Sequence, residues 1–126
     1  MSFSNLTVMI CDDSIFVRKK IKDYISSLGV KAVYEVCDGQ EAIDKYMEYK
    51  PDVAFMDIVM PRKTGIEAVT EIIQMDPNAK VVMASSVGTQ NHLKEALSAG
   101  AYEFLQKPIS NEQIYKILEI VAKDVK

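Results

Sequence analysis

The chain has 126 residues, of which 48% are hydrophobic and 26% charged, and a formal net charge of −3. This balance is typical of one globular domain and excludes a disordered or fibrous chain. The acidic balance argues against nucleic acid as a partner, and no apolar run is long enough to span a membrane. The opening sequence MSFSNLTVMI lacks the basic start and the cleavage site of a signal peptide. We therefore expect a single cytoplasmic domain over residues 1–126 that binds neither nucleic acid nor membranes.

The N-terminal part of the chain predicts a strand, a helix and a second strand. Residues 6–11 (LTVMIC) are continuously apolar, which is typical of a strand buried on both faces. Residues 17–28 carry apolar side chains at helical spacing, and Gly29 marks the end of that helix. Residues 32–37 (AVYEVC) mix polar and apolar side chains, so this strand is expected nearer an edge of the sheet.

Capping-box patterns mark the starts of the next two helices. Asp38 with Glu41 precedes one helix, and Thr64 with Glu67 precedes the other. Between these helices, the apolar run VAFM at residues 53–56 predicts a third strand, buried like the first.

The C-terminal part repeats the alternation. Residues 80–85 (KVVMAS) predict a fourth buried strand, and residues 93–97 predict a short helix. Residues 102–106 (YEFLQ) predict a fifth strand, and Ser110 with Gln113 caps a last helix. Five strand–helix units indicate an α/β fold whose doubly wound parallel sheet is covered on both faces by five helices. Five units in a chain this short favour an open sheet over an eight-unit barrel, which needs about 250 residues.

Polar side chains stand where the predicted strands end. Asp12 and Asp13 follow the first strand, Asp57 follows the third, Ser85 ends the fourth and Lys107 follows the fifth. The carboxyl ends of parallel strands meet at one edge of the sheet, where ligands bind. Any one of these residues could be an ordinary loop residue, and serine is common in turns. Asp57, however, has apolar neighbours on both sides, where a charge is normally paired or metal-bound.

Three carboxylates with an ammonium and a hydroxyl indicate a particular chemistry. Mg²⁺ binds one or two carboxylates, waters and phosphate oxygens. Zinc is disfavoured, because His92 is the only histidine and is expected on the surface of a helix. The phosphate-binding patterns GxxxxGK[ST] and GxGxxG are absent. The set therefore suits a phosphoryl-transfer site in which a carboxylate becomes an aspartyl phosphate.

Both cysteines lie in apolar segments. We interpret Cys11 and Cys37 as reduced core thiols. Since each ends a predicted strand, a redox pair is the alternative interpretation.

Four segments, CDDS, FMDIVMPRKTG, VVMASSVG and AGAYEFLQKP, resemble the receiver domain of bacterial two-component response regulators, in family order. The resemblance covers the whole chain and implies the flavodoxin-like fold with strand order 2-1-3-4-5. Because nothing follows the fifth helix, it also implies a stand-alone, CheY-like chemotaxis regulator.

The resemblance implies a role for each residue at the sheet edge. Asp57 would accept the phosphoryl group. Asp12 and Asp13, with Asp57 and the main-chain carbonyl of Val59, would hold Mg²⁺. Lys107 would bind the phosphoryl group through its ammonium. The peptide bond between Lys107 and Pro108 is usually cis in such domains.

A second set of residues would transmit the signal. Ser85 matches the switch hydroxyl and Phe104 the switch aromatic, although a plain core aromatic is the alternative for Phe104. Gly65 and Gly88 match family glycines at the start of the third helix and in the loop after Ser85. Val59 and Val87 stand where polar side chains are common in the family.

The implied function is a phosphorylation-dependent switch and not an enzyme, apart from Mg²⁺-dependent self-phosphorylation and self-dephosphorylation. A CheA-like histidine kinase would donate phosphate. A target such as a flagellar motor switch protein would bind the face of the fourth helix, fifth strand and fifth helix, where Tyr102, Lys94 and Lys116 are candidates. A phosphatase is a further possible partner.

Three other functions are weighed against this one. The sequence does not distinguish this switch from a phosphorelay intermediate, which passes phosphate onward to another protein. A phosphatase of the aspartyl-phosphate type needs a DxD motif, and a flavoprotein needs a phosphate-binding loop where this chain has DDSIF. Arg62 and Lys63 are either a solvated pair or a contact for an acidic partner or incoming phosphate.

Overall fold

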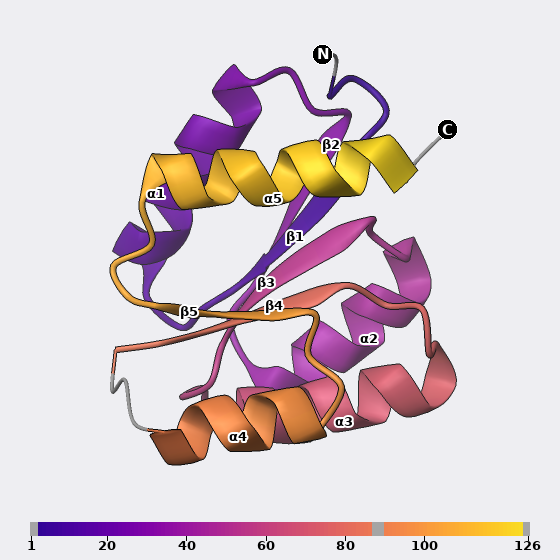
Figure 1. The fold of residues 1–126 in the computed structure, drawn as a ribbon, viewed down its shortest axis with the longest axis vertical. Coiled ribbons are helices and arrows are strands. Elements are labelled where there is room, and N and C mark those ends of the chain that lie inside the picture. The colour runs from indigo at the N-terminus through magenta and orange to yellow at the C-terminus, as the bar shows by residue number, and fades with distance from the viewer. Residues whose placement is uncertain (1–2, 87–89, 125–126) are drawn as a thin grey trace.

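The computed structural model describes residues 3–86 and 90–124, in which strands and helices alternate. The strands are β1 (Thr7–Cys11), β2 (Ala32–Val36), β3 (Val53–Asp57), β4 (Val81–Ser85) and β5 (Glu103–Gln106). The helices are α1 (Ile15–Ser27), α2 (Gly39–Tyr49), α3 (Gly65–Met75), α4 (Gln90–Ser98) and α5 (Asn111–Asp124). Figure 1 shows α1 and α5 on one face of the sheet and α2, α3 and α4 on the other.

The sheet confirms the predicted topology. Its five strands are all parallel and follow the order β2-β1-β3-β4-β5. The winding reverses beside β1, so the carboxyl ends of β1 and β3 lie at a topological switch point, where open α/β sheets bind ligands. Every residue of β3 and β4 is buried, as their continuous apolar runs predict.

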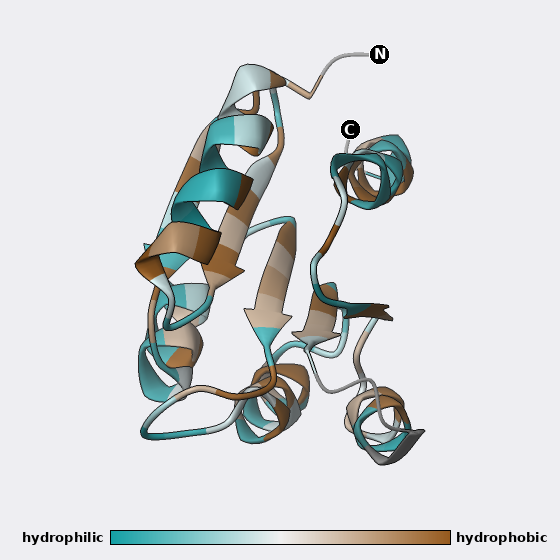
Figure 2. Cartoon of the chain, turned by 90° about the vertical axis from the view of Figure 1, so that its left-hand side faces the viewer, coloured by the Kyte–Doolittle hydropathy of each residue, from teal (hydrophilic) through white to brown (hydrophobic). Residues whose placement is uncertain are grey.

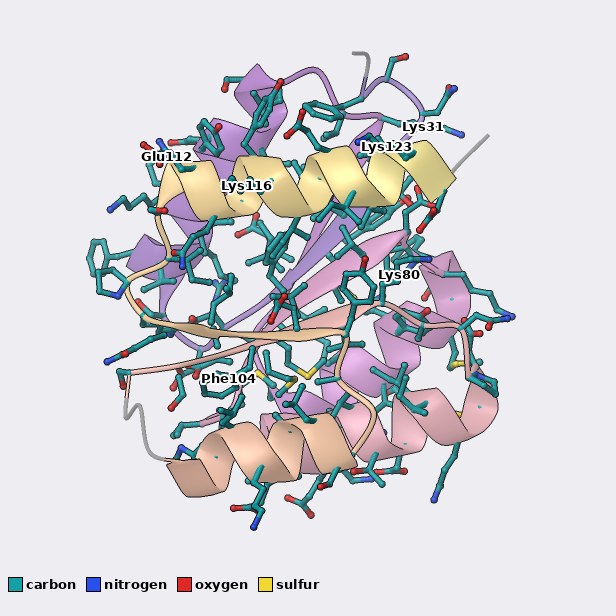
Figure 3. All side chains as sticks on the ribbon, in the orientation of Figure 1. Lys31, Lys80, Phe104, Glu112, Lys116 and Lys123 are labelled. Atoms are coloured by element: carbon teal, nitrogen blue, oxygen red, sulfur yellow. The ribbon has the colours of Figure 1, made fainter. Side chains whose placement is uncertain are left out.

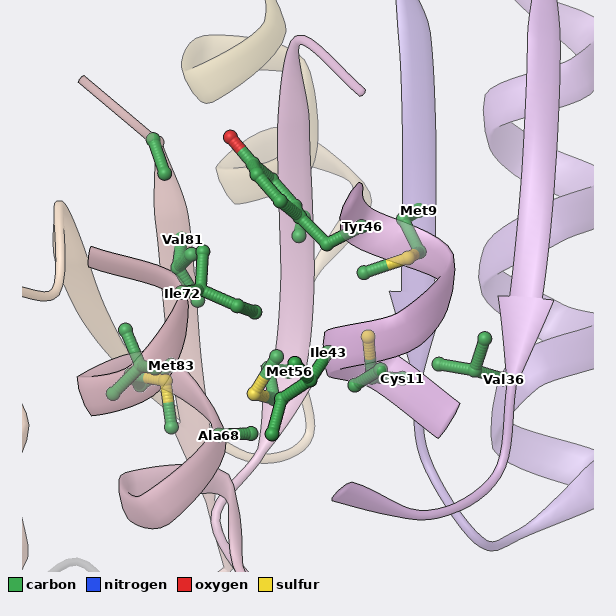
Figure 4. Packing of buried hydrophobic residues seen from close by; sticks show 14 of the residues in the cluster. Met9, Cys11, Val36, Ile43, Tyr46, Met56, Ala68, Ile72, Val81 and Met83 are labelled. Carbon is green, nitrogen blue, oxygen red and sulfur yellow. The ribbon is translucent and has the colours of Figure 1, made fainter. Parts of the chain in front are cut away.

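Two apolar clusters hold the helices on the sheet. Met9, Met56 and Met83 point from the strands into the cluster beneath α2 and α3, where they meet Ile43 and Ile72 (Figure 4). The opposite cluster packs α1 and α5 on the other pleat of the same strands. Burying a side chain of this size contributes about 1.5–3 kcal/mol. Figure 2 shows the matching pattern, with brown apolar helix faces turned inward and teal polar faces outward.

The predicted helix starts are confirmed, with one difference in detail. The Thr64 hydroxyl and the Glu67 carboxylate form a complete capping box at the start of α3. At α2, Asp38 accepts from the Glu41 N–H at 2.7 Å. The Glu41 carboxylate, however, accepts from the N–H of Cys37 instead of closing the box on Asp38.

The cysteines are both free, as expected, but one prediction about them is wrong. Cys11 is buried, whereas Cys37 is exposed. The reason is strand alternation: β2 ends at the buried Val36, and the next residue turns outward into the connection to α2. Within the described ranges, no helix is long and apolar enough to cross a membrane.

Candidate functional site

The pleat of the sheet places three charged side chains on the same side. Along β1, Ile10 belongs to the cluster beneath α1 and α5, and Asp12 follows it by two residues. Asp57 follows Phe55 and Lys107 follows Leu105 with the same spacing. Because strand side chains alternate, all three charges extend from one face at the carboxyl edge.

Lys107 joins the two buried carboxylates. Its Nζ lies 2.6 Å from Asp12 Oδ2 and 3.0 Å from Asp57 Oδ2. Asp12 is 3% exposed and Asp57 is 9% exposed, so water screens neither charge well. The bond between Lys107 and Pro108 is cis, as the resemblance predicts. One ammonium therefore offsets the repulsion between carboxylates from two neighbouring strands.

Backbone donors hold the remaining oxygens of these carboxylates. The N–H of Ser14 donates to Asp12 Oδ1 at 2.8 Å, and the N–H of Val59 donates to Asp57 Oδ1 at 3.2 Å. Arg18 donates to the main-chain oxygen of Asp12 at 2.6 Å. Both carboxylates are thus oriented before any ligand arrives.

Gly65 allows the turn after β3 to close tightly. Its N–H donates to the carbonyl oxygen of Ile58 at 2.8 Å. A Cβ atom at this position would lie 2.2 Å from the carbonyl oxygen of Asp57 and 2.9 Å from the Cα of Ile58. Only glycine fits, because both of these atoms belong to the backbone and cannot rotate away.

Burial and pairing shift the ionisation of the site in identifiable ways. Burial raises the pKa of Asp57, while the hydrogen bond and charge of Lys107 oppose that rise. Burial alone would lower the pKa of Lys107, but its hydrogen bonds to Asp12 and Asp57 outweigh burial and raise it. Lys107 therefore stays charged at neutral pH, and Asp57 is ionised at a cost.

A group of three carboxylates completes the predicted metal ligands. One carboxylate oxygen from each of Asp12, Asp13 and Asp57 lies within 4.8 Å of the other two. Asp13 is exposed, so this side of the group is open to solvent. Oxygen donors from one exposed and two buried carboxylates fit Mg²⁺, which keeps several waters in its coordination shell.

Ser85 and Phe104 follow the other pleat of the sheet. Ser85 follows Met83 by two residues, and Phe104 packs on the same cluster as Met83. Figure 3 shows Phe104 on the side of β5 that faces α4. Ser85 is 1% exposed, and its Oγ lies 3.2 Å from Nδ1 of His92 on α4. His92, which was expected on the surface of a helix, is half-buried on α4 and contacts Ser85.

Val59, Arg62 and Lys63 follow β3 in the connection to α3. Val59 is 60% exposed beside Asp57, whereas Val87 and Gly88 lie outside the described residues. Arg62 lies 3.3 Å from an Asp38 carboxylate oxygen, and Lys63 lies 2.6 Å from a Glu71 carboxylate oxygen. Both cations thus have acidic partners within the chain.

The profile of the response regulator receiver domain matches residues 8–119. The chain belongs to this family. The receiver is 42% identical to the chemotaxis protein CheY of Thermotoga maritima over 116 residues, which are 92% of the receiver and 97% of that protein. It is 40% identical to the chemotaxis protein CheY of Bacillus subtilis over 116 residues, 92% of the receiver and 94% of that protein.

Solved structures agree with this assignment. A chain in the CheX–CheY–BeF₃–Mg²⁺ complex of Borrelia burgdorferi matches the receiver with a TM-score of 0.85 and 32% identity. The match covers 96% of the receiver and 90% of that chain. Receiver domains bind Mg²⁺ at an acidic pocket, and the three clustered carboxylates form such a pocket here.

Proposed function

We propose that the receiver is a phosphorylation-dependent switch of a two-component system, in which Asp57 accepts a phosphoryl group from a histidine kinase. One observation carries this proposal: Lys107 Nζ lies 2.6 Å from Asp12 and 3.0 Å from Asp57, so that one ammonium and two carboxylates meet from three strand ends. Phosphoryl transfer needs positioning and opposite charge more than covalent help.

The residues of the site divide the chemistry among them. One carboxylate oxygen of Asp57 attacks the phosphorus atom, the bond to the leaving group breaks, and an aspartyl phosphate remains. Lys107 neutralises the incoming oxygens, and the N–H of Val59 holds the acceptor carboxylate in place. Asp12, Asp13, Asp57 and the carbonyl of Val59 would hold Mg²⁺, which supplies further positive charge against the phosphoryl oxygens.

The signal would leave the site through the side of the sheet that carries Ser85 and Phe104. The added charge attracts the Ser85 hydroxyl, and Phe104 lies between that edge and α4. Exposed residues on and beside α4, β5 and α5, among them Lys94, Lys116 and Tyr102, which directly precedes β5, would then present an altered surface to a target.

The relatives favour chemotaxis as the setting. Two of them, about 40% identical, are chemotaxis proteins named CheY. A CheA-like kinase and a flagellar motor switch protein are therefore the proposed partners. The Borrelia complex pairs CheY with CheX, which makes a CheX-like phosphatase a further proposed partner.

The direct test is incubation with a small acyl phosphate, followed by intact-mass measurement. We expect the mass of one phosphoryl group to be added when Mg²⁺ is present and no addition when a chelator removes it. Equal labelling with Mg²⁺ and with the chelator, or no labelling under either condition, would refute the proposal.

Magnesium is expected to stabilise the receiver, and Asp13→Asn should weaken that effect. Asp13 is exposed, so the substitution should leave the thermal midpoint of the metal-free protein nearly unchanged. Losing one of three carboxylates should lower Mg²⁺ affinity by about tenfold or more, since charge count sets the affinity of oxygen sites. Thermal midpoints across a magnesium titration measure both quantities through linkage. Identical titration curves for wild type and Asp13→Asn would show that Asp13 does not bind Mg²⁺.

Val59→Asn is expected to shorten the lifetime of the phosphorylated form. Val59 is 60% exposed beside Asp57, and an apolar side chain there cannot position an attacking water. An asparagine offers hydrogen bonds to that water, so dephosphorylation should be faster. The loss of label after donor removal measures the rate, with Val59→Ala as the control that changes size without adding polarity. Equal rates in wild type and Val59→Asn would contradict the explanation.

A further inference from the structure

The lone histidine contacts the residue to which the proposed function gives the sensing role. Ser85 Oγ lies 3.2 Å from Nδ1 of His92. Ser85 is 1% exposed at the end of β4, and His92 is half-buried on α4. The distance is that of a hydrogen bond, and Ala96 of α4 lies buried in the apolar cluster on the same face of the sheet.

Ser85 lies near both His92 and the strand that carries Asp57. Its place in the pleat is that of Met83, on the α4 side, whereas Asp57 and Lys107 belong to the opposite pleat. Yet β4 lies directly beside β3, where the N–H of Ile58 donates to the carbonyl of Ala84 at 3.0 Å. In the His92 tautomer whose Nδ1 carries no proton, the Ser85 hydroxyl donates its single hydrogen to Nδ1 and cannot donate it to another acceptor at the same time. A bond from Ser85 to His92 and a bond from Ser85 to a phosphoryl oxygen therefore compete.

We propose that His92 is a positioning residue, which holds the Ser85 hydroxyl on α4 in the unphosphorylated receiver. This inference rests on the proposed function, because it takes Ser85 to be the hydroxyl that binds the phosphoryl group. When that group forms on Asp57, it draws the hydroxyl away from His92, and α4 loses a bond to the sheet. The contact thus favours the unphosphorylated conformation and links the chemical event to helix α4.

The surroundings of His92 fit this role. Its side chain lines a groove of about 420 Å³ between α4 and the β3–α3 turn, together with Val59, Ile66, Glu67 and Glu95. Val59 follows the acceptor Asp57 by two residues. A change in the position of α4 therefore alters the groove that borders the acceptor.

The test measures affinity for beryllofluoride, which mimics a phosphoryl group on a carboxylate, in the presence of Mg²⁺. Fluorine NMR serves as the readout, because the chain has no tryptophan to report binding. His92→Leu removes the acceptor and should tighten binding by about threefold to tenfold, the effect of one hydrogen bond. His92→Asn places an oxygen near the position of Nδ1 and should restore an affinity within about twofold of wild type.

A second background separates positioning from general packing. In Ser85→Ala, which has no hydroxyl to hold, His92→Leu should leave beryllofluoride affinity unchanged. The inference fails if His92→Leu has the same effect in both backgrounds, if it has none in wild type, or if His92→Asn behaves like His92→Leu. Absence of beryllofluoride binding by the wild-type receiver would instead contradict the proposed function itself.

Discussion

Asp57→Asn is expected to abolish labelling by a small phosphodonor while leaving the receiver folded. The amide cannot act as the nucleophile, and no other carboxylate shares its contacts with both Lys107 and the N–H of Val59 among the described residues. Because burial raises the pKa of Asp57, its negative charge opposes folding. The variant should therefore melt at or above the wild-type temperature when Mg²⁺ is absent.

The raised pKa of Asp57 also predicts how the difference in thermal midpoint between the variant and wild type changes with pH. A carboxyl with a raised folded-state pKa disfavours folding when ionised, and that penalty disappears as pH falls through the raised pKa. The difference in thermal midpoint between Asp57→Asn and wild type should therefore shrink on acidification. Asp44→Asn, an exposed α2 carboxylate, is the matched control and should label normally. Labelling of Asp57→Asn at the wild-type level would assign the acceptor elsewhere.

Gly65→Ala is expected to be the most destabilising small substitution near the site. The new Cβ would lie 2.2 Å from the carbonyl oxygen of Asp57, so β3 or α3 must move. Overpacking against backbone that cannot yield costs about 3 kcal/mol or more. For a domain of this size we expect the thermal midpoint to fall by about 10 °C. Phosphorylation should slow as well, because the displaced backbone carries the acceptor.

Gly29→Ala is the matched control for this substitution. Gly29 has φ +81° with nothing within 4 Å of the added Cβ, so only the left-handed backbone is strained. That strain costs about 1 kcal/mol. Calorimetry measures the thermal midpoint of both variants. The fall in Gly65→Ala reports the steric overlap, and the fall in Gly29→Ala reports the backbone strain. A smaller loss in Gly65→Ala than in Gly29→Ala would contradict the close approach described for Gly65.

The strands and most helix starts could be predicted because their signals are local. Continuous apolar runs gave β3 and β4, and Thr64 with Glu67 gave the start of α3. The meeting of Asp12, Asp57 and Lys107 was also predictable, since parallel strands bring their carboxyl ends together. The strand order needed the family resemblance, because alternation alone allows several windings.

The contact between Ser85 and His92 could not be predicted in the same way. Which side chain of α4 faces β4 depends on how the helix rotates as it packs, and in α4 the apolar Leu93 and Leu97 are exposed whereas Ala96 is buried. The exposure of Cys37 was missed for a local reason, because β2 ends at Val36, one residue earlier than predicted. Tertiary packing therefore decided the position of His92, and the end of a strand decided that of Cys37.

The bond between Lys107 and Asp12 spans 95 positions of the chain. Contacts of such long sequence separation require much of the chain to be ordered before they can form. During synthesis, both buried acids leave the ribosome long before the cation that neutralises them. The receiver is therefore expected to accept a phosphoryl group only once β5 has joined the sheet. Nascent chains, and chains truncated before β5, should not be phosphorylated.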